Sequence, residues 1–199
     1  QDISDKLKLN STLIYVNQRV DNRMYRKGRE RNPANNYMYI TPNMSRANLF
    51  PYKDSNGDAF NYEGPFNNPY WNIYENTNQD ITNRVVANLT LNWDILKGLK
   101  LTARANGVLN KVDRLEFNNV GAAFDPNGLY REIDVNRQNW NYEAILNYTK
   151  RFNNLSIVSL LGVNKFDLRT TGTRQTAISL LQRDIMSLAN GDEFAPIIY

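Results

Sequence analysis

Eight aromatic side chains between residues 50 and 76 are the best candidates for contact with a ligand. They stand among Asn, Asp and Gly residues, so flat rings that can stack on a sugar or a peptide side chain lie near amides that can bond hydroxyls. The same rings could instead hold a long loop folded, and this alternative applies above all to Tyr70 and Trp71. The candidate ligand-facing residues are Tyr52, Phe60, Tyr62, Phe66, Tyr70, Trp71 and Tyr74.

The sequence contains few residues or motifs that could support catalysis or bind a metal ion. The chain has no His and no Cys, which excludes imidazole bases, cysteine nucleophiles, thiolate zinc sites and disulfides. It has no G-x-S-x-G motif and no Walker loop. A glycosidase needs only two carboxylates, but nothing in the sequence singles out a pair. The stretch "DSNGD" at 54–58 lacks the remaining ligands of a calcium loop and indicates a turn. We predict no enzyme activity, no metal and no cofactor.

Much of the net charge of +4 lies in the run "QRVDNRMYRKGRER" at 18–31. A basic run that contains an aromatic residue could grip a nucleic-acid backbone. Asp21 and Glu30 dilute this run, and no nucleic-acid-binding motif accompanies it. We therefore interpret it as a solvated loop that faces water or anionic surface groups, and we expect no nucleic-acid partner.

Two-residue alternation of apolar and polar side chains predicts five strands, because successive side chains of a strand point to opposite faces. In residues 81–93, for example, Leu89 and Trp93 share one face, while Asn88 and Asn92 share the other. The predicted strands cover about 6–20, 81–93, 99–112, 138–149 and 155–168.

The connections alternate between tight turns, at 94–98 and 150–154, and long loops. The long loops are predicted at 21–80, 113–136 and 169–199. In the last of these, helical spacing predicts a short amphipathic helix that contains Ile178, Leu181, Ile185 and Leu188. The final residues, "NGDEFAPIIY", do not predict a strand.

Long alternating strands with short turns on one side and long loops on the other are typical of transmembrane β-barrels. Hydrocarbon cannot satisfy backbone polar groups, so such a sheet closes on itself, with apolar side chains outward and a polar interior. The aromatics near both strand ends fit interfacial girdles. Five strands cannot close a barrel of this type, which predicts an all-β, antiparallel segment of a larger one. The alternative is a soluble β-sandwich, such as a carbohydrate-binding module. The predicted lumen-facing residues are Arg84, Lys100, Arg104 and Glu143.

The motif "FNNPYW", followed by "ITNRVVANLTLNWDILKGLKLTARANGVL", resembles the SusC/RagA family of TonB-dependent outer-membrane transporters. The matching features are an NPYW-like loop at Asn68–Trp71, a strand that contains Arg84, a hairpin at Gly98–Leu99 and a return strand at Leu101–Gly107. The later "NYEAILNYTKRFNNLSIVSLLGVN" is similar to the next hairpin of that family. The plug domain, the TonB box and the rest of the barrel have no counterpart in these residues, so the resemblance implies a middle section of the barrel.

The resemblance implies a function as well. Members of this family import oligosaccharides or peptides across the cell outer membrane of Bacteroidetes-type bacteria. A SusD-like surface lipoprotein caps them, and TonB energises them through parts of the protein not present here. Under this interpretation the sheet contacts outer-membrane lipid, and the aromatic loop could also face the capping lipoprotein.

Overall fold

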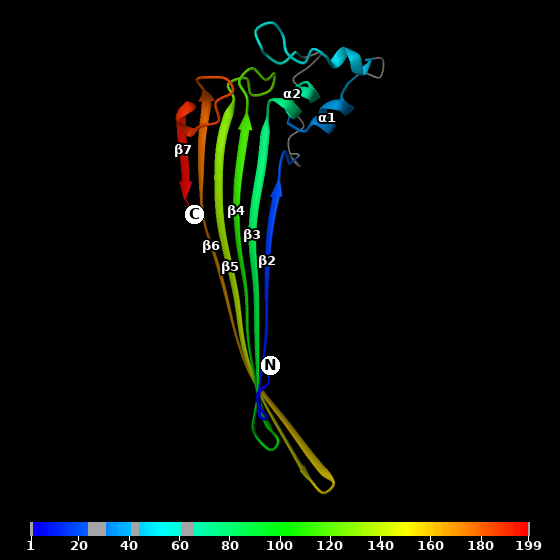
Figure 1. Cartoon of the computed structure of the whole chain (residues 1–199), viewed down its shortest axis with the longest axis vertical. Helices are drawn as coiled ribbons and strands as arrows, with labels where there is room; N and C mark the ends of the chain where they lie inside the picture. The colour runs from blue at the N-terminus through cyan, green and yellow to red at the C-terminus, as the bar shows by residue number, and fades with distance from the viewer. Residues whose placement is uncertain (1, 24–30, 41–43, 61–65, 199) are drawn as a thin grey trace. The chain divides into compact units, whose positions relative to one another are not determined.

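The fold is all-β, as the sequence predicts. The computed structural model describes residues 2–23, 31–40, 44–60 and 66–198. Within these residues, seven strands form one antiparallel sheet in sequential order from β1 to β7, which Figure 1 traces from β2 to β7. The strands are β1 (Asp2–Ser4), β2 (Leu7–Val20), β3 (Thr77–Leu96), β4 (Leu99–Asn118), β5 (Leu129–Phe152), β6 (Leu155–Leu180) and β7 (Gly191–Ile198).

Short helical segments lie in the connections. The connection between β2 and β3 contains α1 (Pro33–Met38), the 3-10 turn η1 (Arg46–Leu49) and α2 (Pro69–Tyr74). A second 3-10 turn, η2 (Leu188–Asn190), precedes β7. Both α-helices begin with Asn-Pro: the Asn side chain caps free backbone N–H groups, and Pro suits the first helical position. In the described part of the chain, no helix has both the length and the apolar character needed to cross a membrane.

The central strands are longer than the sequence pattern indicates. β3 starts at Thr77 rather than at 81, and β4 continues to Asn118 rather than to 112. β5 starts at Leu129 rather than at 138, and β6 continues to Leu180 rather than to 168. Alternation fades in these extensions because polar side chains occupy both faces. Backbone pairing continues there all the same, with cross-strand ion pairs such as Arg131–Glu116 in place of apolar contacts.

The helix predicted around Ile178–Leu188 is not formed. β6 continues through Ile178, which pairs with Glu193 of β7. Asn190 organises the intervening turn, because its Nδ2 donates to the backbone oxygens of Gln182 at 2.7 Å and Ile185 at 3.0 Å. The prediction that the final residues form no strand is also wrong. β7 contains Pro196, and a strand at the end of a sheet tolerates a residue without a backbone donor.

The chain divides into two compact units. Unit 1 consists of residues 1–17, 82–111 and 135–171, and unit 2 of residues 18–81, 112–134 and 172–199. Unit 2 contains a small core of Phe117, Tyr130, Ala177 and Leu180, with partly buried apolar side chains packed against it. Unit 1 is built from strand segments and the tight turns. Gly98, at a φ of 85°, closes the turn between β3 and β4 in a backbone conformation that favours glycine.

In unit 1 each of β3, β4 and β5 has one apolar and one polar side. Leu89, Ala103, Tyr142 and Val163 of neighbouring strands lie round a common hollow, and a Cβ on Gly107 of β4 would meet the ring of Trp140 of β5, so the apolar sides of these strands coincide. We call this side the apolar face and the opposite one the polar face. The apolar face consists of Val85, Ala87, Leu89, Leu91 and Trp93 of β3; Leu101, Ala103, Ala105 and Leu109 of β4; Trp140, Tyr142, Ala144, Leu146 and Tyr148 of β5; and Leu155, Ile157, Leu161 and Val163 of β6.

Candidate functional site

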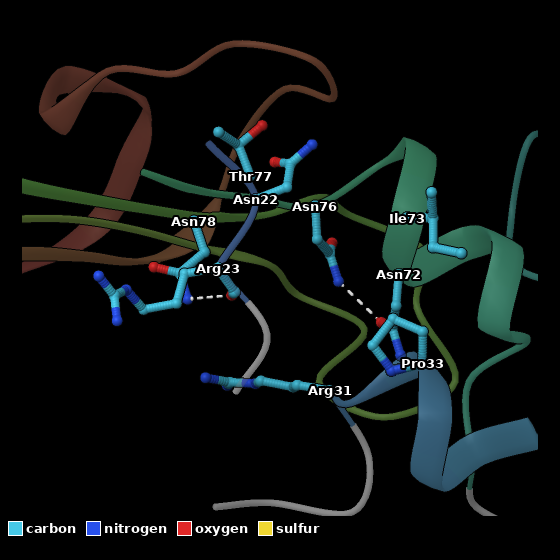
Figure 2. A pocket seen from close by; sticks show the side chains of 9 residues that line it. All are labelled: Asn22, Arg23, Arg31, Pro33, Asn72, Ile73, Asn76, Thr77 and Asn78. Carbon is cyan, nitrogen blue, oxygen red and sulfur yellow. Dashed lines mark hydrogen bonds between the residues drawn. The ribbon is translucent and has the colours of Figure 1, made fainter. Parts of the chain in front are cut away.

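A cavity of about 290 Å³ in unit 2 combines positive charge with amide side chains. Its walls come from the end of β2, the start of α1, the end of α2 and the start of β3, and Figure 2 shows it from close by. We call it the arginine pocket. The lining residues are Asn22, Arg23, Arg31, Pro33, Asn72, Ile73, Asn76, Thr77 and Asn78.

The backbone of Arg23 is fixed to β3. Asn22 has a φ of 52°, a left-handed conformation that Asn adopts more readily than most residues, and it turns the chain after β2. The N–H of Arg23 then donates to the oxygen of Asn78 at 2.8 Å, and Asn78 Nδ2 donates back to the oxygen of Arg23 at 2.7 Å. This reciprocal pair holds the arginine at the edge of the pocket.

Arg31 reaches the pocket from the segment before α1. Its Nη2 lies 2.5 Å from Oδ2 of Asp125, which has a φ of 66° in the connection between β4 and β5. Asn32 follows it and caps α1, accepting from the N–H of Ala34 at 3.0 Å. The pocket is therefore lined by two arginines, Arg23 and Arg31, that both come from the segment between β2 and α1. In Figure 2 the two side chains extend in the same direction, one above the other.

Beside the pocket, one buried carboxylate contacts two arginines. Asp80 has a side chain only 4% exposed, and both Arg23 and Arg114 reach it through Nε, Arg114 at 2.6 Å. Arg23 Nε is in contact with the carboxylate but makes no aligned hydrogen bond, so we treat this contact as an ion pair only. Two guanidinium groups thus share one carboxylate, while Arg31 is matched by Asp125.

The amide wall of the pocket belongs to a buried asparagine network. Asn72 Oδ1 accepts from Asn67 Nδ2 at 3.0 Å and from Asn76 Nδ2 at 2.8 Å. Asn76 Oδ1 in turn accepts from the backbone N–H of Asn119 at 3.1 Å, which ties α2 to the connection after β4. Sequence analysis missed this network. The available signal was the recurrence of Asn at positions 67, 68, 72 and 76, in a short segment of eleven residues, 66–76, that is rich in aromatic side chains.

Beside this network, four aromatic rings form one cluster. Phe50 lies 4.2 Å from Tyr70 between ring centroids, Tyr52 lies 5.5 Å from Tyr74, and Tyr70 stacks on Tyr74 at 6.1 Å. We call these four residues the aromatic cluster. Tyr74 is 60% exposed, so the cluster offers a ring to solvent. Three of the candidates from the sequence are therefore brought together here.

The remaining aromatic candidates lie elsewhere. Trp71 is fully buried and cannot contact a ligand in this conformation, and Lys53 lies 5.8 Å from the centre of its ring. Phe66 stacks on Tyr39 at 4.6 Å, and Phe60 is 41% exposed. Tyr62 and residues 24–30 of the basic run lie outside the described residues.

Electrostatics around the aromatic cluster centres on Glu75. Lys53 Nζ lies 2.7 Å from Glu75 Oε1, and the hydroxyl of Tyr52 donates to the same oxygen at 3.1 Å. Burial, together with this hydrogen bond to a carboxylate, raises the pKa of Tyr52 above its usual value. The phenol therefore stays protonated well into alkaline solution.

The predicted lumen-facing residues share the polar face of the sheet. Arg104 Nη1 lies 3.0 Å from Glu143 Oε2, so these two form a cross-strand ion pair between β4 and β5. On the same face, Thr102 donates to Asn92 at 3.0 Å. Arg84 and Lys100 are exposed, and no carboxylate of the described residues pairs with either. The structure places all four on one side of the sheet by strand alternation.

Within the described ranges, no three acidic side chains gather in a way that could hold a metal ion. Comparison of the chain with protein-family models and with curated proteins found no match.

Proposed function

We propose that the chain is a section of the β-barrel of a TonB-dependent outer-membrane importer of the SusC/RagA type. In this proposal the protein takes up oligosaccharides or peptides together with a SusD-like surface lipoprotein. TonB would act through other parts of the protein. The observation that carries the proposal is the height and position of the apolar face.

On β3 the apolar face extends from Val85 to Trp93. This span of nine residues matches the roughly 9–11 residues with which a tilted transmembrane β-strand crosses the hydrocarbon core. Leu89 on this face is 43% exposed, and such a contiguous apolar surface needs a covering of lipid or protein. Lipid fits the limited height of the band.

The band ends at a polar border. Beyond Val85 and Leu109, the side chains of Asn83, Lys111 and Asn136 line a common hollow on the same side of the sheet. A change from apolar to polar at the same position on three neighbouring strands is what a membrane–water interface requires. A soluble sandwich has no reason to stop its apolar side at one common border.

Between β5 and β6 the band is displaced. A Cβ on Gly107 would meet the ring of Trp140, and one on Gly162 would lie 3.8 Å from the oxygen of Ala144. On β5 the apolar face continues past Ala144 to Trp140, whereas on β6 it ends at Val163, next to Gly162. The band therefore moves toward the tight turn between β5 and β6. Strands tilted by about 35–45° in a closed barrel produce this displacement.

The test uses neighbouring positions on opposite faces. Single substitutions Leu91→Cys and Asn92→Cys are made in the protein at its natural length, after removal of any other reactive thiol. The protein is then reconstituted in liposomes and treated with a water-soluble maleimide. We expect rapid labelling at 92 and protection at 91 that detergent denaturation abolishes. Equal labelling at both positions, or a protein that stays monodisperse without detergent, would refute the proposal.

A further inference from the structure

We propose that Asn119 couples the aromatic cluster to the connection between β6 and β7, so that the two open and close together. The coupling runs through unit 2, to which all of its residues belong. It does not depend on the proposed import function, because it follows from contacts inside this unit.

Asn119, which follows β4, is the central residue of this coupling. It is 1% exposed, and its Nδ2 donates to Oε2 of Glu75 at 3.1 Å and to Oδ1 of Asp184 at 2.5 Å. Its Oδ1 accepts from the backbone N–H of Asp184 at 3.1 Å. Hydrogen bonds to ionised acceptors are among the stronger ones in proteins. One buried amide therefore holds two carboxylates that come from different connections.

Glu75 extends the coupling to the aromatic cluster. It directly follows α2, which contains Tyr70 and Tyr74, and its Oε1 accepts from the hydroxyl of Tyr52 at 3.1 Å. The side chain of Glu75 is only 8% exposed, so water does not easily replace a lost donor. Loss of the bond from Asn119 would leave a buried carboxylate oxygen without this donor, which favours opening of the segment that carries it.

Asp184 lies in a turn that Asn190 fixes. Asn190 Nδ2 donates to the backbone oxygens of Gln182 and Ile185, which stand on either side of Asp184, and Asn190 Oδ1 accepts from the N–H of Gln182 at 2.9 Å. Because Asn190 directly precedes β7, this turn moves with the adjoining ends of β6 and β7. A contact that holds Asp184 therefore also restrains this end of the strand pair.

Arg183 supplies a second contact beside the first. Its Nη1 donates to the backbone oxygen of Asn56 at 3.0 Å, and its Nη2 pairs with Asp58. A Cβ on Gly57 or on Gly121 would meet this guanidinium, so glycine at these two positions leaves the space that it occupies. Two neighbouring residues of one turn are thus attached to separate parts of the connection between β2 and β3.

Coupling between two segments is reciprocal: a change that favours opening of one favours opening of the other by the same factor. The exposed ring of Tyr74 belongs to the aromatic cluster at one end of this coupling. A partner that contacts this ring would therefore also restrain the turn around Asp184.

Hydrogen exchange read by mass spectrometry tests the coupling in the protein at its natural length, in detergent if the protein requires it. Asp184→Gly removes the side chain but suits the backbone, since Asp184 has a φ of 63°. We expect protection to fall at least about fivefold in peptides that cover residues 181–190, and also in peptides that cover residues 50–59 and 69–76. Peptides from unit 1 should keep wild-type protection. A loss confined to residues 181–190 would overturn the inference.

Two variants of the same turn serve as controls. Gln182→Gly introduces the same flexibility at an exposed residue whose side chain makes none of these contacts, so only residues 181–190 should lose protection. Asp184→Asn keeps a side-chain oxygen and a residue type that adopts the left-handed backbone, so it should retain most of the wild-type protection. If Gln182→Gly lowers protection of residues 50–59 as much as Asp184→Gly does, the effect is a general loosening of unit 2 and the inference is wrong.

The reverse direction uses Glu75→Ala, which removes the carboxylate at the other end of the coupling. It should lower protection of residues 181–190 at least about fivefold, because Glu75 is linked to them through Asn119. Unchanged protection of residues 181–190 in this variant would show that the two ends open independently. Asn119 would then stabilise its own surroundings only, and the proposed coupling would be refuted.

Discussion

Replacement of Asp80 by Asn should lower the local stability of unit 2, because this carboxylate contacts two arginines from different segments of that unit. Asp80 is 4% exposed, and it joins Arg23 after β2 and Arg114 of β4. Asn keeps the shape and removes the charge, so both ion pairs are lost while both guanidinium groups stay in place.

The magnitude follows from burial. Removal of one partner from a fully buried pair destabilises by about 3–5 kcal/mol. The side chains of Arg23 and Arg114 are 40% and 37% exposed, so water screens both and they can be rehydrated. We therefore expect a loss of about 2 kcal/mol in local stability after this discount, which corresponds to roughly a 30-fold change in an opening equilibrium.

Hydrogen exchange read by mass spectrometry measures this change locally. Peptides that cover residues 66–80 and 112–120 should lose roughly 30-fold in protection, whereas peptides in unit 1 should stay unchanged. The control is Asp21→Asn, which removes an exposed carboxylate. Asp21 accepts a hydrogen bond from Gln79, which has the largest lowering effect on its pKa, and it also pairs with Arg19, which lowers that pKa further. If Asp80→Asn changes protection no more than this control does, our assignment of Asp80 as the link between these segments is wrong.

Three further changes test other parts of the structure. Trp71→Ala should destabilise the connection between β2 and β3 by about 3–5 kcal/mol, because Trp71 is fully buried. Tyr74→Ala, at a residue that is 60% exposed, should change the stability little. Limited proteolysis should therefore cut the connection faster in Trp71→Ala than in Tyr74→Ala. Gly107→Ala should displace Trp140, since a Cβ there would clash with its ring. A shift in tryptophan emission with a loss of about 1–3 kcal/mol should follow, and an unchanged spectrum would contradict this packing. Because the pKa of Tyr52 is raised in the folded state, its contribution to stability is complete below the usual tyrosine pKa of about 10 and is lost as the pH rises through the folded-state pKa. Protection of the segment around Tyr52 from hydrogen exchange should therefore fall above about pH 10 in the wild type but not in Tyr52→Phe.

The centres of the strands could be predicted from the sequence, but their ends could not. Leu89, Leu91 and Trp93 alternate with Asn88 and Asn92, and only a strand places them on two clean faces. At the other end of β3, Asn78 and Asp80 are both polar and both buried, because their partners come from β4 and from the segment after β2. Nothing local in the sequence distinguishes such residues from a loop.

The candidate site was also predicted only in part. Tyr70 and Tyr74 were identified as candidates because aromatic residues stand out in composition, and the structure brings them together. The arginine pocket depends on contacts over long sequence distances, such as Arg31 with Asp125. The sequence shows the basic run, but it does not show which carboxylate each arginine contacts.

The reciprocal hydrogen bonds between Arg23 and Asn78 have a consequence for how such a protein can change. β2 and β3 are neighbours in the sheet, so the long connection between them has only to leave one strand and return to the next. The entropy of loop closure grows slowly with length, by about 0.6 kcal/mol for each doubling, so the sheet places little restriction on what the connection contains. With its two ends tied at Arg23 and Asn78, this connection could be exchanged for another of different length and sequence while the strands keep their register. The pocket and the aromatic cluster that this connection helps to form can then change without any change in the part of the protein that forms the sheet.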